Sequence, residues 1–571
     1  MRYQTMLLTS ALGVILLALT ACGGVKSRND QPLADQRNLI DDVRYSQDDI
    51  NQGNVAFEDL FYAGKHIFSN RFTAEDHYGE HPQLGPRTSN YKLFGRPGYP
   101  FLRFNGLDSQ SCLECHLAAG FAPQKNYLAD NSQIRFAKQP GFTGGGAGFA
   151  SNAFGLADFA CSAEQPGCEP QYATRGIIRN PPHAFGAGYT QSLAEEMSWD
   201  LQEKLMQAQA NPGTEVELIT KGISFGRIKV LPDGTLDTSM LEGISKDLTV
   251  RPFQWRGIAS NLRNFVRDAM NFHFSVQPAE FLRDHPDMDD NDSLYDEILE
   301  GEVTAVATYL AFLRPPVESS KGLDAAQVSH GRVLFEQVGC SSCHVPSLTL
   351  NHDIATIRDP RMDQSMTGEI NQMMSTSYNS VAPKIEGDMV SRGYFITAPY
   401  GVPPTIEKFV VKHTMVEKMP PGEVVTSDKL SLWLQQKLKG YNHTLSFKKG
   451  PPETQPRLPN SGDQVEVPLY SDLKRHQLGN NLAEPTKEPQ KDDGGNAVAD
   501  TLFLTRPLWG VADTAPWMHD GRALSLDAAI KMHKGEASEA NGSIDSYLAL
   551  AESEQEAIRA FLSSLRLPVI Q

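Results

Sequence analysis

Two short stretches, Cys112-Leu113-Glu114-Cys115-His116 and Cys340-Ser341-Ser342-Cys343-His344, share the pattern Cys-x-x-Cys-His. This spacing is the attachment signature of a c-type haem, in which both thiols form thioethers to the porphyrin and the adjacent histidine becomes the proximal iron ligand. A structural zinc site would need a second pair of Cys or His ligands near each motif. A redox dithiol would not need the histidine. The motifs therefore predict two covalently bound haems c.

The N-terminus has the pattern of an export signal. An apolar run from Met6 to Leu19 follows Arg2; it is too short to span a bilayer comfortably and has the length of a signal peptide. It ends in Leu-Thr-Ala-Cys, which resembles a bacterial lipoprotein cleavage site, so we expect residues 1–21 to be removed and Cys22 to be lipidated. An ordinary signal peptide cut nearby is the alternative. Because Gly23 rather than Asp follows, Gram-negative sorting favours the outer membrane, facing the periplasm.

The remaining cysteines also suit an exported protein. The chain has seven cysteines, of which four belong to the two motifs and one is Cys22. Cys161 and Cys168 lie close together in the sequence, and a short loop disulfide between them fits an oxidising compartment. Every cysteine then has a role, and none remains as a catalytic thiol.

Composition indicates a globular protein with redox partners rather than nucleic-acid partners. The 571 residues allow two or three domains. The net charge of −17 argues against nucleic-acid binding and favours a basic or dipolar redox partner. No segment after the N-terminal run is apolar and long enough to span a membrane, so we expect membrane contact through the lipid anchor only.

The chain is predicted to use one structural unit twice. A small cytochrome c domain has a helix before the haem motif and a closing helix that packs on it. Asp324 is the expected N-cap of the helix before the second motif, and Ser553 with Glu556 is the expected capping box of the last helix. The helical stripes are Phe57, Leu60, Phe61, Gly64 and Phe68; Leu299, Val303, Val306, Leu310 and Leu313; Val328, Leu334 and Phe335; and Ile558, Phe561, Leu562 and Leu565.

These units define the predicted domains. The fold class is mainly α, with two cytochrome c-type haem domains that carry long loops and insertions. Residues 22–50 are expected to be a polar tether, residues 51–318 the N-terminal haem domain and residues 319–571 the C-terminal haem domain. Two stretches rich in Pro, Lys, Asp, Glu and Gly, 446–468 and 480–499, are expected to be exposed loops.

One acidic stretch is a candidate calcium site. It is Asp287-Met288-Asp289-Asp290-Asn291-Asp292, which offers several carboxylates but lacks the ligand spacing of an EF-hand. A solvated acidic face is the favoured interpretation.

Three stretches near the C-terminus carry a family resemblance. They are Thr505-Arg506-Pro507-Leu508-Trp509-Gly510-Val511, Ala515-Pro516-Trp517-Met518-His519-Asp520-Gly521-Arg522 and Leu526-Asp527-Ala528-Ala529-Ile530-Lys531-Met532-His533-Lys534-Gly535-Glu536-Ala537. The chain resembles the bacterial di-haem oxidoreductases, a family described as peroxidases and sometimes labelled thiol oxidoreductases. That family is similar to the di-haem cytochrome c peroxidases and to the di-haem enzyme that matures methylamine dehydrogenase. The resemblance covers most of the mature chain and recurs at Arg179 to Pro182, Val250 to Gly257, Gly331 to Pro346 and Tyr470 to Leu473.

The resemblance implies how the C-terminal haem is ligated. In the peroxidase superfamily, its sixth ligand comes from the helix after the His-Asp-Gly turn, where the best-known branches have Met or Tyr. Aligning Leu526 to His533 with that helix places His533 at the ligand position, so His344 and His533 would form a low-spin bis-histidine site. Met532 is the fallback ligand, and the alternative interpretation of His533 is a surface helix residue. His519, within the turn, is expected to hydrogen-bond locally.

The resemblance also implies that the haem on His116 reacts with substrate. The peroxidases have a Trp between the two haems and a Glu on the distal side, and Trp255 and Glu280 are the nearest matches here. Glu280 would act as acid and base on bound peroxide, although its distance in sequence from Trp255 is longer than in the peroxidases. His273 is a rival for this site, as a distal base or as a displaceable sixth ligand.

Two departures from the family pattern remove candidate Met ligands. Ser275-Val276-Gln277 stands where many members have Gly-Met-Gln, and Leu478 stands where a Met is common. His273 and His476 are left as candidates near these positions, each weighed against a hydrogen-bonded structural histidine.

The sequence therefore predicts a di-haem c-type oxidoreductase. Electrons from a small cytochrome or cupredoxin would enter at the His344 haem and pass to the His116 haem, where hydrogen peroxide or a similar small oxidant is reduced. One alternative is a pure electron-transfer protein with both irons six-coordinate. Another is an oxidase or oxygenase that acts on an organic or protein substrate. A thiol oxidoreductase role has the least support, because no free cysteine remains.

Overall fold

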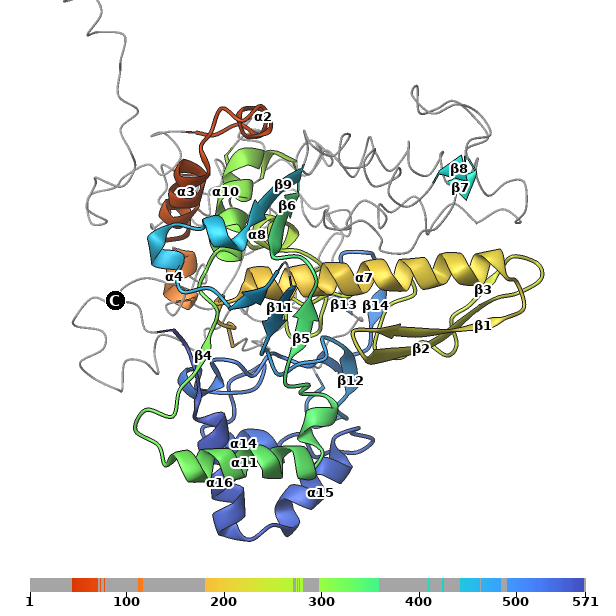
Figure 1. The fold of residues 1–571 in the computed structure, drawn as a ribbon, viewed down its shortest axis with the longest axis vertical. Coiled ribbons are helices and arrows are strands. Elements are labelled where there is room, and N and C mark those ends of the chain that lie inside the picture. Colours follow the sequence, from red (N-terminus) through yellow and green to blue (C-terminus); the bar gives the residue numbers. More distant parts are fainter. Residues whose placement is uncertain are drawn as a thin grey trace, which may run out of the picture. The chain divides into compact units, whose positions relative to one another are not determined.

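The computed structural model of the chain describes residues 44–69, 72, 76, 111–116, 180–270, 274, 276, 278–280, 297–358, 409–410, 424–425, 442–462, 464–483 and 490–568, all within the unit Arg37–Gln571 (Figure 1). The α-helices are α2 (Gln47–Asn51), α3 (Phe57–Ser69), α4 (Cys112–Cys115), α7 (Ala187–Ala210), α8 (Leu262–Ala269), α10 (Glu300–Ala311), α11 (Ala325–Gln337), α14 (Leu526–Lys531), α15 (Asn541–Ala549) and α16 (Glu552–Leu562). Short 3-10 helices are η6 (Cys340–Ser342), η8 (Phe447–Lys449), η9 (Pro452–Thr454) and η10 (Val511–Asp513). No helix in the described ranges is both long enough and apolar enough to cross a bilayer.

The helix before the first motif packs against the predicted closing helix. α3 buries its apolar stripe, and nearly every residue of α10 is buried against it. A Cβ atom added at Gly64 would overlap the carbonyl oxygen of Ala305, so the two backbones approach more closely there than any larger residue would allow. Phe61 and Tyr309 meet edge to face beside this crossing, with ring centroids 5.3 Å apart. The predicted pairing of these two helices is confirmed.

The second helix pair repeats this construction. α11 crosses α16 (Figure 1), and a Cβ atom added at Gly331 would overlap the carbonyl oxygen of Ala557. Phe335 and Phe561 pack edge to face with centroids 5.4 Å apart. Asp324 caps α11 as predicted, because its carboxylate accepts hydrogen bonds from the first backbone N–H groups of the helix.

The predicted start of the last helix is wrong by one residue. α16 begins at Glu552 rather than Ser553, and the carboxylate of Glu554 accepts a hydrogen bond from the backbone N–H of Ala551 at 2.9 Å. The structure has Ala551 at the N-cap and Glu554 at the third helical position, so Ser553 and Glu556 each lie two positions too far along the chain. Several acidic side chains lie in this segment, and Glu554 is the one whose carboxylate accepts the hydrogen bond from the N–H of Ala551.

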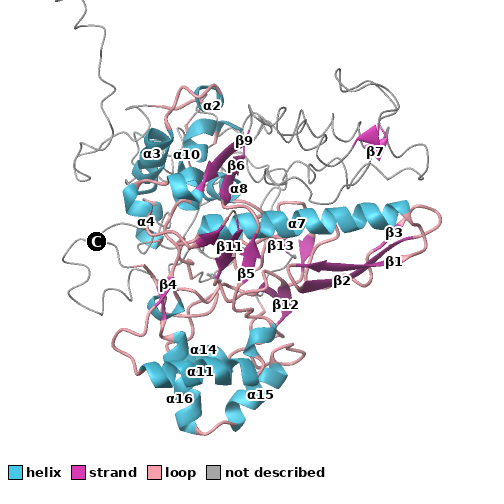
Figure 2. Cartoon of the chain, in the orientation of Figure 1, coloured by secondary structure: helices cyan, strands magenta, loops and turns pink. Residues whose placement is uncertain are grey.

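Small antiparallel sheets join the helices (Figure 2). The strands are β1 (Glu215–Thr220), β2 (Ile223–Val230), β3 (Leu236–Asp237), β4 (Val317–Glu318), β5 (Leu348–Leu350), β6 (Ile354–Arg358), β7 (Phe409–Val410), β8 (Val424–Val425), β9 (Asn442–Ser446), β10 (Asn460–Ser461), β11 (Gln464–Val467), β12 (Arg475–Gln477), β13 (Gln490–Lys491), β14 (Ala497–Val498), β15 (Leu502–Leu504) and β16 (Leu565–Arg566). β1, β2 and β3 form a hairpin sheet that packs on α7, and β16 pairs with β4 to link the end of the chain to the segment between the helix pairs.

The two stretches expected to be exposed loops are partly buried. Within 446–468, β11 pairs with β5, and Val465 and Val467 are fully buried. Within 480–499, Asp492 and Asp493 both form ion pairs with the buried guanidinium of Arg251. These charged residues are inside because each has a charged partner, which removes most of the cost of burial.

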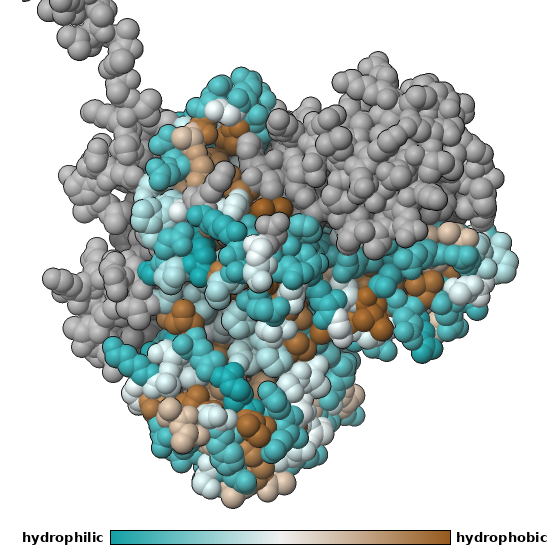
Figure 3. All heavy atoms as spheres, in the orientation of Figure 1, coloured by the Kyte–Doolittle hydropathy of each residue, from teal (hydrophilic) through white to brown (hydrophobic). Residues whose placement is uncertain are grey.

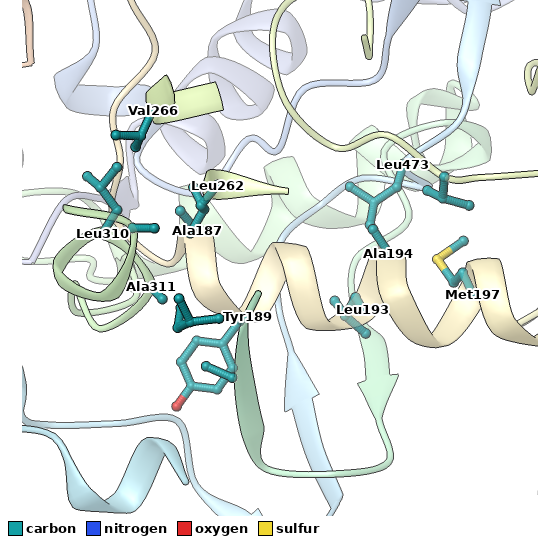
Figure 4. Close-up of a cluster of buried hydrophobic side chains, with 14 of the residues drawn as sticks. Ala187, Tyr189, Leu193, Ala194, Met197, Leu262, Val266, Leu310, Ala311 and Leu473 are labelled. Carbon is teal, nitrogen blue, oxygen red and sulfur yellow. The ribbon is translucent and has the colours of Figure 1, made fainter. Parts of the chain in front are cut away.

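The main core lies between α7, α8 and α10. Figure 4 shows Ala194 of α7 near Leu473, and Leu262 and Val266 of α8 on the side of Leu310. Each fully buried aliphatic side chain of this kind stabilises the fold by about 1.5–3 kcal/mol relative to an exposed one. On the face seen in Figure 3, apolar residues occur in small separate groups among hydrophilic ones.

Several sequence predictions concern residues outside the described ranges. They are the signal peptide with Cys22, the Cys161–Cys168 disulfide, the acidic stretch 287–292 and His273. The end of the predicted tether, by contrast, is folded: α2 lies within residues 22–50 for most of its length, and Ile50 is buried. Arg44 forms an ion pair with Glu302 of α10 at 3.1 Å, so the folded part begins before residue 51.

Candidate functional site

Both Cys-x-x-Cys-His motifs face one large cavity of about 980 Å³. Cys112 and His116 line it from the first motif, and Cys340, Cys343 and His344 from the second. Its volume lies at the upper end of the range typical of cofactor and small-molecule sites. Its apolar wall is supplied mainly by Phe68, Phe253, Trp255, Phe274, Leu310, Phe335, Leu482, Phe503, Leu508 and Trp509.

The polypeptide enters the second motif through a tight turn. α11 ends at Gln337, and Gly339 follows with φ of 85°, a left-handed conformation that glycine adopts without strain. The backbone N–H of His344 then donates to the carbonyl of Cys340 at 3.0 Å. In the first motif, the N–H of His116 donates to Cys112 at 2.9 Å. Both motifs are therefore single turns, and Cys112 and His116 of the first and Cys340, Cys343 and His344 of the second line the same cavity.

The two motif histidines are held in the same tautomer. Nδ1 of His116 lies 2.8 Å from the carbonyl oxygen of Pro182, and Nδ1 of His344 lies 3.1 Å from that of Tyr470. A carbonyl oxygen can only accept, so in each ring Nδ1 carries the proton and donates. The lone pair is then on Nε2, which is the arrangement that metal-bound histidines have.

His533, the predicted sixth ligand, lies beside His344. Their ring centroids are 6.5 Å apart and their planes make an angle of 71°. Nδ1 of His533 lies 2.8 Å from the carbonyl oxygen of Ala529, one turn earlier in the chain, so this ring also keeps its Nε2 lone pair. An iron bound to two imidazoles at about 2 Å from each nitrogen would separate the centroids by roughly 6 Å. The pair therefore fits a bis-histidine haem.

Burial keeps this histidine pair neutral. Burial and the facing ring of His533 lower the pKa of His344 to about 4. Burial also lowers the pKa of His533, against the hydrogen bonds to Ala529 and Ile530. Neutral imidazole is the form that binds a metal, so neither ring would have to lose a proton at neutral pH to do so.

His476 has both ring nitrogens occupied. Nε2 lies 2.7 Å from a carboxylate oxygen of Asp472, and Nδ1 lies 2.7 Å from one of Glu539. Burial would lower the pKa of His476, but the hydrogen bond to Asp472 and the contact with Cys343 outweigh it and raise that pKa to about 11. Both ring nitrogens are engaged by carboxylates, so neither is directed at an iron in this arrangement. The structural interpretation of His476 is the one that its contacts support.

Trp255 lies on the cavity wall. Its Nε1 donates to the carbonyl oxygen of Asn180 at 2.7 Å, and its ring centroid is 6.4 Å from that of His519. Asn180 in turn donates through its backbone N–H to His519 at 2.7 Å and through its side chain to Pro516 at 2.6 Å. These bonds tie the chain beside His116 to the His-Asp-Gly turn, and Trp255 is fixed at the point where they meet.

Glu280 lies away from the cavity wall. Its side chain is 2% exposed, and its two carboxylate oxygens accept hydrogen bonds from Arg263 at 2.9 and 2.5 Å. Arg263 also donates to Thr304 of α10, so the pair connects α8 to α10. The acid–base role of Glu280 stays a prediction, and its observed contacts are those of a structural ion pair. His273 lies outside the described residues.

Several residues of the site were not singled out by sequence reasoning. The carbonyl oxygens of Pro182 and Tyr470 and the carboxylate of Glu539 act on the motifs from elsewhere in the chain. Pro182 and Tyr470 do lie in stretches that carry the family resemblance. The resemblance could therefore have identified these two segments as part of the site. It could not have identified the carbonyl oxygens, because a backbone group leaves no trace in the pattern of side chains.

Comparison with known families agrees with this geometry. Residues 442–565 match the family model described as "Di-haem oxidoreductase, putative peroxidase". The matched range contains Tyr470, which holds His344, and also His533, the ring that faces it. Among curated proteins, none matches the chain. This match supports the family suspected from the sequence: residues 442–565 are similar to the di-haem oxidoreductases.

Proposed function

We propose that this protein is a c-type di-haem oxidoreductase that reduces hydrogen peroxide or a similar small oxidant. The observation that carries the proposal is the pair of facing rings, His344 and His533, with both Nδ1 protons donated to backbone carbonyls. Such a pair closes one haem iron on both sides, as an electron-transfer site requires. The other motif lines the same cavity, so the haem that it would bind is left to react with the oxidant.

The proposed haem attachments follow the two motifs. Cys112 and Cys115 would bind one haem with His116 as its proximal ligand. Cys340 and Cys343 would bind the other, with His344 and His533 as its axial ligands. Bound haem supplies one-electron exchange at iron and, where an axial position is open, a binding place for a small oxidant.

We assign electron entry to the His344 side and reduction of the oxidant to the His116 side. Reduction of hydrogen peroxide to two waters takes two electrons and two protons. Trp255 supports the transfer between the sides, because its indole lies on the wall of the cavity that both motifs line. Its ring is held in place by Asn180, which limits its motion.

A side chain of this protein must move a proton between the two oxygens of the peroxide. We favour His273 for this role over Glu280. The preference rests on Glu280, whose two oxygens are both taken by Arg263. The carboxylate of Glu280 is held in this buried ion pair and does not line the cavity that both motifs share.

We further propose export, with a lipid on Cys22 as the anchor to the outer membrane. The electron donor would be a small cytochrome or cupredoxin with a basic or dipolar surface. The net charge of −17 supports such a donor, because opposite charges speed the encounter of redox partners.

Absorption and EPR spectra of the purified protein test this function. They are recorded fully oxidised and half-reduced, each with and without peroxide, and a pyridine haemochrome assay counts the haems. We expect one low-spin bis-histidine haem and one haem whose high-spin ferric signal, as isolated or after half-reduction, changes with peroxide. Two low-spin signals that ignore peroxide and cyanide would instead identify an electron carrier with both irons closed.

A further inference from the structure

Arg506 is a half-buried cation in the cavity wall that lacks a carboxylate partner among the described residues. It lies in the segment between β15 and η10, and its Nη1 donates to the carbonyl oxygen of Pro252 at 3.4 Å. Its guanidinium carbon is 5.6 Å from the ring centroid of Trp255. Burial alone lowers the pKa of Arg506 to about 10, and no neighbouring acid acts to raise it.

Two arginines that are buried elsewhere in the protein have carboxylate partners of the kind that Arg506 lacks among the described residues. Arg251 forms ion pairs with Asp247, Asp492 and Asp493, and Arg263 forms one with Glu280. A guanidinium stays protonated in proteins, so withdrawing it from water without an anion is unfavourable. The indole face of Trp255 offsets only part of this cost.

We propose that Arg506 binds a propionate carboxylate of a haem, with Trp255 supporting the guanidinium from its ring face. Haem c carries two propionates, and each needs a cation or water when it is buried. Arg506 lines the cavity that both motifs share, and its planar fork of N–H donors matches a carboxylate. The inference rests on the proposed binding of haem c and does not depend on the reduction of peroxide.

The assignment has a measurable electrostatic consequence. Reduction adds an electron to the haem, and a cation beside its propionate stabilises the reduced state. Removing that cation should lower the midpoint potential of the haem to which the propionate belongs. The other haem should change much less, because its propionates would have other partners.

The test is a spectroelectrochemical titration of the haem-loaded protein, wild type against Arg506→Gln and Arg506→Lys. Arg227→Gln is the matched control, because it removes one positive charge from β2, where the side chain is 53% exposed. We expect Arg506→Gln to change the ratio of oxidised to reduced haem at fixed potential by about tenfold for one haem, which is about 59 mV for one electron. Arg506→Lys should fall between, and Arg227→Gln should match wild type.

The possible results separate the propionate from other anions. The assignment is overturned if Arg506→Gln changes the ratio of oxidised to reduced haem at fixed potential by less than twofold for both haems. If Arg506→Gln does not fold, the same criterion applies to Arg506→Lys. A second pattern also overturns it. In this pattern, added chloride or formate changes the wild-type spectrum, and Arg506→Gln loses this change. The midpoint potentials of the two proteins in anion-free buffer are the same. Arg506 would then bind an exogenous anion. A shifted midpoint potential with unchanged peroxide turnover would support the propionate assignment. It would count against electron transfer past Trp255 as the rate-limiting step. The propionate assignment and the proposed electron transfer can therefore fail separately.

Discussion

The two motif regions share a construction and differ in what surrounds the histidine. In each, a glycine lets two helices cross at backbone contact, and a backbone carbonyl fixes the tautomer of the motif histidine. Around His344 lie a second neutral imidazole, His533, and a charged one, His476. A phenylalanine ring lies beside each motif histidine, Phe68 at 6.2 Å from His116 and Phe335 at 6.3 Å from His344, so this contact is common to both. The comparison teaches that the scaffold places the motif histidine in the same way twice, whereas His533 and His476 belong to the second region.

The largest expected effect comes from removing the ring that faces His344. His533→Ala should abolish the low-spin signal of the bis-histidine haem, because no second imidazole remains on the open side. EPR spectroscopy of the oxidised protein measures this, and added imidazole should restore the signal. Met532→Leu is the control, because the neighbouring Met is the alternative ligand. If Met532→Leu removes the signal and His533→Ala does not, the assignment of His533 is wrong.

The ion pair between Glu280 and Arg263 gives the next effect. Glu280→Gln should destabilise the protein by about 3–5 kcal/mol, because it leaves a buried guanidinium without its anion. Glu242→Gln, which removes an exposed partner of Lys474, should change the stability by less than about 1 kcal/mol. Chemical unfolding followed by circular dichroism measures both.

The same variants distinguish a structural glutamate from a catalytic one. If Glu280 only supports the fold, the turnover of peroxide by folded Glu280→Gln should stay within tenfold of wild type. An acid–base group usually contributes about 10²- to 10⁴-fold. A loss of that size with unchanged stability would restore Glu280 to the catalytic role that the family resemblance implies.

The helix crossings can be tested one at a time. Gly331→Ala should cost about 1–3 kcal/mol or more, because its Cβ would overlap the carbonyl oxygen of Ala557. Gly64→Ala should cost a similar amount against Ala305. Gly542→Ala in α15 is the control, since its Cβ would meet nothing within 4 Å. It should be neutral or stabilising by up to about 1 kcal/mol in the same unfolding assay. Equal effects of all three would mean that the crossings are not tight.

Sequence reasoning reached the features that have a local signature. The apolar stripes of α3, α10, α11 and α16 repeat every three or four residues, so the helices could be predicted together with their pairing. The family resemblance within one segment singled out His533, whose ring lies 6.5 Å from that of His344. The strand β11 could not be predicted, because four residues in a polar stretch form a strand only through pairing with β5, more than one hundred residues earlier in the chain.

The same distinction applies to the buried charges. Asp492 and Asp493 lie in a segment that has the composition of a surface loop, and what holds them inside is Arg251. Glu280 likewise matches a catalytic position by its place in the chain, and only the fold shows that Arg263 occupies it. Contacts between distant segments decide these cases, and no local pattern encodes them.

The smallest expected effect concerns the charged ring beside the second motif. His476→Gln should destabilise the protein by about 1.5–3 kcal/mol at neutral pH, because Asp472 loses its charge-assisted hydrogen bond. The pKa of His476 is raised to about 11 in the folded protein, above its ordinary value of 6.5. Its stabilising contribution is therefore complete below about pH 6.5 and is lost as the pH rises through the folded pKa.

Free energies of unfolding measured from pH 6 to pH 10 in both proteins test this sign. The difference between wild type and His476→Gln should shrink as the pH rises. In the haem-attached protein, Cys343 would be an uncharged thioether, so only Asp472 and Glu539 would hold the proton and the decline should begin earlier. A difference that grows with pH would mean that His476 is neutral in the folded state, and this ring would again be a candidate iron ligand.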